Sequence, residues 1–60
     1  MNSPADIARR TFLLELDNAG FEITDWEAEF LADQLDQPRP LTPAQRQAID
    51  DLMIKYGARL

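Results

Sequence analysis

The sequence has no cysteine and no histidine among its 60 residues. Disulfides and the Cys/His zinc sites that stabilise many small domains are therefore excluded. A chain of this length buries only about 60% of the surface that its unfolded form exposes, so stability must come from regular helices, close packing or a partner. The absence of cysteine also fits a reducing compartment, and we expect a cytoplasmic protein.

Long hydrophobic runs are absent as well. No apolar run approaches the roughly 20 residues that span a bilayer. The first segment, residues 1–5, is short and polar, and Arg9 and Arg10 interrupt any hydrophobic stretch of the kind found in a secretory leader. We therefore expect neither a membrane segment nor a secretory leader. Apolar residues make up 45% of the chain and charged residues 28%, which is typical of a single globular domain over residues 1–60.

A nucleophile of the triad type would have to rely on Lys55, the only lysine, as its base, and paired carboxylates for hydrolysis exist only by count. A domain this small has little room for a substrate pocket of about 300 Å³ or more. The loop pattern of a calcium-binding hand is absent. We expect no enzyme activity, no catalytic residue, no cofactor and no metal site.

Three helix-start signals are present. Each places a hydroxyl N-cap residue three positions before an acid or a glutamine, as in a capping box. The pairs are Ser3/Asp6, Thr24/Glu27 and Thr42/Gln45. A proline follows the first and third caps, at the position where helices tolerate it best.

The expected helix ends follow from glycine and proline. Gly20 can take the left-handed C-cap conformation, Pro38 stops the second helix, and Gly57 closes the third. The sequence thus predicts helices over about 4–19, 25–36 and 43–56. It predicts an all-α fold, a compact three-helix bundle.

Apolar residues indicate which faces of these helices pack. The first helix has them around much of its circumference, and Phe21 should fold back onto its last turn. The third has a stripe of Ala48, Ile49, Leu52, Met53 and Tyr56. Ile54 lies opposite this stripe and is either a surface residue or part of a dimer seam. We favour the former, and expect a monomer.

Charge is distributed very unevenly along the chain. The net charge is −5, with +1 on residues 1–14, −8 on residues 15–36 and +2 on residues 37–60. The middle segment contains no lysine or arginine. Binding to nucleic-acid phosphates needs a basic face, so direct nucleic-acid binding is not expected. The acidic segment favours a basic protein partner instead.

On a helix at 100° per residue, four carboxylates of this segment fall within an arc of about 80°. They are Asp25, Glu29, Asp33 and Asp36. Neighbouring acids in this set are three or four residues apart, and each such like-charge pair destabilises the helix by a few tenths of a kcal/mol. With Glu27 counted as a fifth carboxylate, the helix carries one per about 3.3 Å, close to the ~3.4 Å charge spacing of a DNA strand. The four acids are either a solvated face or a partner-binding face that imitates phosphates.

An aromatic patch of Trp26 and Phe30 borders the acids. Trp26 is most simply a core residue, and its alternative role is an interface anchor. The candidate partner-binding residues are Asp25, Glu29, Asp33, Asp36, Glu22, Trp26 and Phe30. Arg9 and Arg10 are expected to be solvated or paired with these acids, and Arg39 to contact a partner or Asp36.

Three segments carry a resemblance. They are Trp26-Glu27-Ala28-Glu29-Phe30-Leu31, Leu41-Thr42-Pro43-Ala44-Gln45 and the run from Ile49 to Tyr56. The match spans residues 26–56, about half of the chain, and resembles small phage-encoded helical proteins. A similar pattern recurs in segments of phage replication and recombination proteins. In size, acidity and helical content the chain is also similar to type I anti-CRISPR proteins, several of which imitate DNA with carboxylates.

The anti-CRISPR resemblance implies a partner with a basic DNA-binding channel, the type I surveillance complex, in the host bacterial cytoplasm. It implies that Asp25, Glu29, Asp33 and Asp36 act as phosphate mimics. We therefore expect an inhibitor of a nucleic-acid-binding complex, acting as a DNA mimic. The resemblance to replication proteins implies the alternative of an adaptor that docks on a helicase or primase through Trp26 and Phe30.

Overall fold

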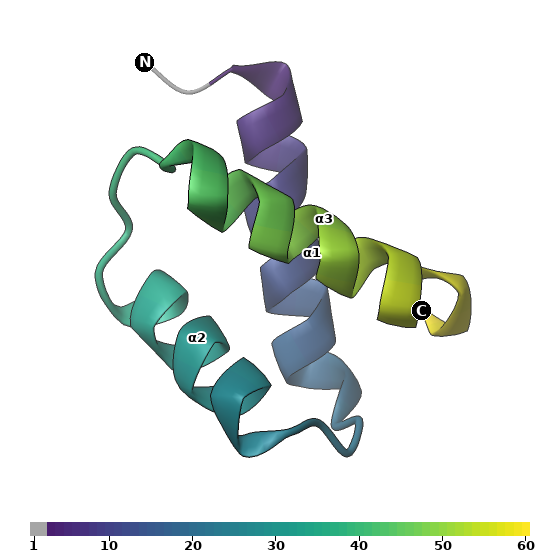
Figure 1. The fold of residues 1–60 in the computed structure, drawn as a ribbon. Coiled ribbons are helices and arrows are strands. Elements are labelled where there is room, and N and C mark those ends of the chain that lie inside the picture. Colours follow the sequence, from purple (N-terminus) through teal and green to yellow (C-terminus); the bar gives the residue numbers. More distant parts are fainter. Residues whose placement is uncertain (1–2) are drawn as a thin grey trace.

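The computed structural model describes residues 3–60, which form three α-helices and a short 3-10 helix (Figure 1). Their bounds are α1 Pro4–Ala19, α2 Asp25–Asp36, α3 Pro43–Tyr56 and η1 Gly57–Arg59. No strand occurs within this part of the chain. The prediction of an all-α fold with three helices is confirmed, and so are the predicted helix bounds.

The N-caps explain why the helices begin where they do. Thr24 Oγ1 accepts from the Glu27 amide at 3.1 Å, and the Glu27 carboxylate accepts from the Thr24 amide at 2.8 Å. Thr42 and Gln45 repeat this reciprocal pair at the start of α3. Both capping boxes are therefore present, as predicted.

The two helix-ending glycines differ in conformation. Gly20 has φ +70°, the left-handed C-cap expected from the sequence. Gly57 has φ −57° and ψ −38°, which is right-handed, and the chain continues from it into η1. Only Gly20 therefore needs the conformational freedom of a glycine.

In Figure 1, α3 crosses in front of α1, and α2 lies to one side of the crossing. The radius of gyration is 10.7 Å, near the ~10 Å expected for a compact chain of this length. The core contains residues from all three helices and Leu41 from the loop between α2 and α3. Its buried members are Phe12, Leu13, Leu16, Leu31, Leu41, Ile49, Leu52 and Tyr56.

Not all apolar residues of the chain lie in the core. Phe21 is partly buried, packs against the core and stacks on Tyr56, with 6.0 Å between ring centroids. Met53, expected in the buried stripe of α3, is exposed. Ile54 is 81% exposed, which confirms its place opposite that stripe. Ile7 and Leu14 of α1 are also exposed.

Candidate functional site

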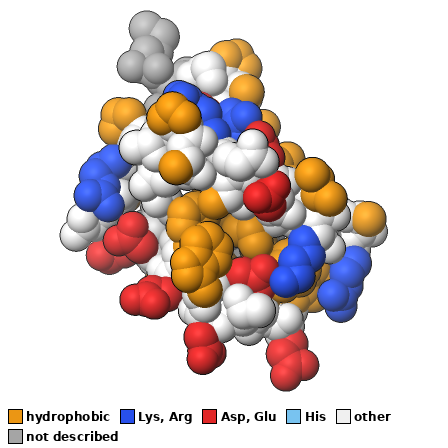
Figure 2. Space-filling model, viewed as in Figure 1, with side chains coloured by type: hydrophobic (Ala, Val, Ile, Leu, Met, Phe, Trp, Pro, Cys, Tyr) orange, Lys and Arg blue, Asp and Glu red, His pale blue; other side chains and the backbone are white. Residues whose placement is uncertain are grey.

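The four acids predicted as phosphate mimics share the outer side of α2. All four side chains are exposed. In Figure 2 acidic groups border the left and lower edges of the molecule, on the side where Figure 1 places α2, and a hydrophobic area lies inside this border. The regular helix thus places the four carboxylates together as its geometry requires.

These carboxylates are almost uncompensated. Asp33 pairs with Arg39 at 3.5 Å, and both side chains are more than half exposed. Arg39 was expected to contact a partner or Asp36, so its pairing with Asp33 is a correction. Within residues 3–60, Asp25, Glu29 and Asp36 form no ion pair. The face keeps nearly all of its negative charge for solvent or a partner.

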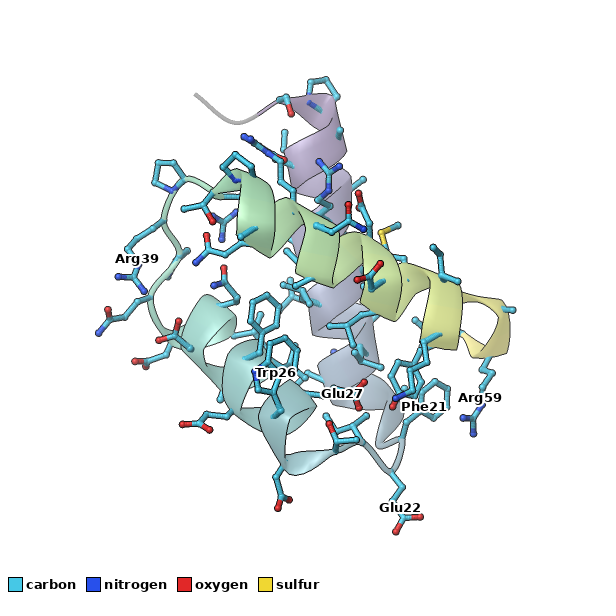
Figure 3. All side chains as sticks on the ribbon, in the orientation of Figure 1. Phe21, Glu22, Trp26, Glu27, Arg39 and Arg59 are labelled. Atoms are coloured by element: carbon cyan, nitrogen blue, oxygen red, sulfur yellow. The ribbon has the colours of Figure 1, made fainter. Side chains whose placement is uncertain are left out.

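Trp26 lies outside the core. Its side chain is 61% exposed, so the interpretation of Trp26 as a core residue is wrong. The inward side of α2 is occupied instead by Glu27, Leu31 and Gln34. Trp26 stacks on half-buried Phe30, with ring centroids 5.3 Å apart and planes within 5° of parallel. Figure 3 shows the indole in front of α2, in the space toward α3.

The acids and the aromatic rings meet in one shallow hollow. Its lining consists of Trp26, Glu29, Phe30 and Asp33. Residues four apart on a helix are surface neighbours, so the aromatic pair and the acidic pair form two adjacent rows. The hollow therefore combines two aromatic side chains with two carboxylates.

Glu22 does not belong to this face. It lies in the loop between α1 and α2 and borders a different hollow, with Lys55 and Arg59 (Figure 3). Arg59 lies over the Phe21 ring at 4.5 Å from the centroid. Of the seven predicted partner-binding residues, the structure brings together all except Glu22.

Glu27 was predicted only as the capping-box partner of Thr24, and the sequence did not reveal its contacts with α3. It is buried, and its carboxylate accepts from Lys55 Nζ at 2.9 Å and from the Tyr56 hydroxyl at 2.8 Å. The hydrogen bond from the Thr24 backbone, followed by those from Lys55 and Tyr56, lowers the pKa of Glu27 to about 2. Glu27 thus connects α2 to the end of α3 through these hydrogen bonds and is not part of the exposed face.

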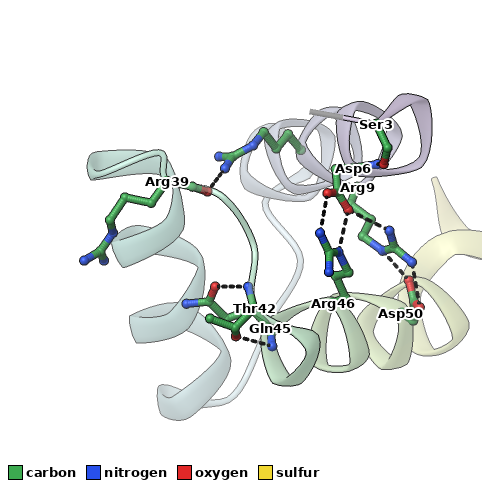
Figure 4. A network of polar contacts seen from close by, with 9 residues as sticks. Ser3, Asp6, Arg9, Arg39, Thr42, Gln45, Arg46 and Asp50 are labelled. Carbon is green, nitrogen blue, oxygen red and sulfur yellow. Dashed lines mark hydrogen bonds and ion pairs between the residues drawn. The ribbon is translucent and has the colours of Figure 1, made fainter. Parts of the chain in front are cut away.

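A second buried acid, Asp6, holds α1 against α3 (Figure 4). Its carboxylate accepts from Arg46 at 3.0 and 2.9 Å and from Arg9 at 2.8 Å. The Arg46 hydrogen bond is the main cause of the lowered pKa of Asp6. Arg9 also donates to Asp50 at 2.9 Å.

The two N-terminal arginines are therefore not available to the acids of α2. Arg9 is engaged by Asp6 and Asp50, and Arg10 donates to the backbone carbonyl of Arg39. The expectation that they are solvated or paired with the acids of α2 is wrong. Their partners lie on α1, on α3 and in the loop between α2 and α3, which leaves the charge of α2 exposed.

Other site types find no support in the part of the chain that the structure describes. Residues 3–60 contain no cluster of acids that could hold a metal ion and no helix long and apolar enough to cross a membrane. No protein-family model, curated protein or solved structure matches this chain. The candidate binding surface is the acidic-aromatic face, defined as Asp25, Trp26, Glu29, Phe30, Asp33 and Asp36.

Proposed function

We propose that this protein is a small inhibitor that binds a nucleic-acid-binding protein through the acidic-aromatic face, in the manner of a DNA mimic. The observation that supports this most is the row of exposed carboxylates on α2, of which only Asp33 has an ion-pair partner among residues 3–60. A groove that binds phosphates presents cations, which the four exposed carboxylates can engage. The expected density of one carboxylate per about 3.3 Å counted Glu27 as well, and without this buried acid the exposed face of α2 has one per about 4.1 Å. The specific target that we propose is a type I CRISPR surveillance complex in the bacterial cytoplasm.

The charge distribution supports a protein partner over nucleic acid itself. The exposed face of α2 is acidic, and phosphate groups would be repelled by it. The cations that could counter this charge are mostly engaged elsewhere, Arg9 and Arg46 by Asp6 and Lys55 by Glu27. A basic surface would therefore meet an acidic helix with little internal competition.

The exposed Trp26 favours a second candidate, an adaptor that docks on a replication protein. An aromatic anchor binds through desolvated contact area, which salt affects little, whereas a phosphate mimic depends on screened charge. The two functions therefore differ in the salt dependence of binding.

Affinity capture distinguishes the two candidates. The immobilised protein is exposed to a lysate from bacteria with a type I CRISPR system, and bound proteins are released with increasing salt or with duplex DNA. The inhibitor function predicts a nucleic-acid-binding complex that both treatments release. Retention of a replication protein in high salt and in excess DNA would contradict the inhibitor and support the adaptor.

A further inference from the structure

We infer that the hollow lined by Trp26, Glu29, Phe30 and Asp33 receives an arginine side chain of the partner. This inference rests on the proposed function, since it names the group by which that partner is recognised. The hollow offers both kinds of group that bind a guanidinium. The exposed indole provides a ring to stack on, and the two carboxylates provide hydrogen-bond acceptors.

The ring geometry leaves one indole face available. Trp26 and Phe30 are parallel within 5°, so Phe30 covers one side of the indole. Because the indole is 61% exposed, the other side remains open to a ligand. The same chain already holds an arginine on an aromatic ring, where Arg59 lies 4.5 Å from the centroid of Phe21.

The chemistry of the hollow selects arginine over lysine. A planar guanidinium can stack on a ring while it donates two parallel hydrogen bonds to a carboxylate, and an ammonium cannot do both. Glu29 is free to accept such bonds, because it forms no ion pair within residues 3–60. The hollow is thus more selective than a purely acidic surface.

Arg39 is an internal competitor for part of this site. Its guanidinium lies 3.5 Å from Asp33, and exposed pairs of this kind contribute little to stability. A partner arginine can replace it without disturbing the core. Substitution Arg39→Gln should therefore tighten arginine binding, by up to about fivefold.

Two probe peptides of equal charge test the inference, hexa-arginine and hexa-lysine, each acetylated and amidated. Trp26 is the only tryptophan, so its fluorescence and its indole N–H resonance report on the hollow directly. Titrations at low salt should give about fivefold tighter binding of hexa-arginine. Calorimetry with Trp26→Leu should show both peptides binding with equal affinity, and circular dichroism should show an intact fold.

Equal affinity of the two peptides for the wild-type protein would overturn the inference, and so would a preference for arginine that survives in Trp26→Leu. Failure of both peptides to bind would also overturn it. These failures differ from failure of the proposed function. If lysate capture is lost on charge reversal of α2 but unaffected by Trp26→Leu, the inhibitor function stands without an arginine site.

Discussion

Single residues on α2 have opposite roles although they share a charge. Glu27 is buried and accepts three hydrogen bonds, whereas Glu29, two positions on, is exposed and has no ion-pair partner among the described residues. Side chains two positions apart on an α-helix point to nearly opposite sides, so Glu27 faces the core while Glu29 faces the solvent. We propose that stability and binding depend on different carboxylates of this helix.

The first prediction concerns the charge of Glu27. Glu27→Gln keeps an acceptor for the Thr24 amide but removes the charge that faces Lys55. We expect a loss of about 1–3 kcal/mol in the free energy of unfolding, because position 27 and its partner Tyr56 are buried. Urea unfolding measures it. The matched substitution Glu29→Gln, at an exposed site, should change stability by about 0.5 kcal/mol at most. Equal effects would contradict the role assigned to Glu27.

The second prediction is a pH dependence with a defined sign. The pKa of Glu27 is about 2 in the folded protein, below its ordinary value of 4.5. The unfolded chain therefore binds more protons between these values, and the stabilisation from Glu27 is lost as pH falls through them. The lowered pKa values of Asp6 and Asp50 act in the same direction. Thermal unfolding should show a midpoint that falls from about pH 5 to pH 2, less steeply in Glu27→Gln.

At the scale of the helices, local signals in the sequence were sufficient to predict the bounds. The caps of α2 and α3 lie within three residues of the groups that they bind, and Gly20 acts on its own backbone. Such short-range interactions can be predicted from residues that are close together in the sequence. They account for the agreement between predicted and observed helices.

The partners of the charged side chains could not be predicted in this way. Glu27 and Tyr56 are 29 positions apart, and Asp6 and Arg46 are 40 apart. These contacts depend on how α1, α2 and α3 cross, which no local pattern encodes. The same holds for Trp26, whose exposure depends on which side of α2 faces the core. The four acids of the face were identified because they share one helix.

The third prediction tests the helix ends with a matched pair of glycine substitutions. Gly20→Ala places a side chain at φ +70° and should destabilise the fold by about 1 kcal/mol or more. Gly57→Ala is at a right-handed position with no atom near the added carbon, and should stabilise the fold by about 0.4–1 kcal/mol. Chemical denaturation measures both. A stabilising effect at Gly20 would contradict its assigned conformation.

At the scale of the molecule, charge is divided between two tasks. Asp6, Arg9, Arg46 and Asp50 form a network that joins α1 to α3. Glu27 and Lys55 join α2 to α3. The acids on the outer side of α2 take no part in either network. Variants of the four acids of this face should therefore change binding while the fold is preserved.

The measurement that tests the central claim most directly is lysate capture with two charge-reversed variants. Glu29→Lys/Asp33→Lys alters the face, and Glu15→Lys/Asp17→Lys alters two exposed acids of α1 by the same net charge. Circular dichroism verifies that both variants fold. Loss of the nucleic-acid-binding partner in the α2 variant alone is the predicted result. Equal capture by the wild type and both variants, or equal loss in both variants, would contradict the acidic-aromatic face as the binding surface.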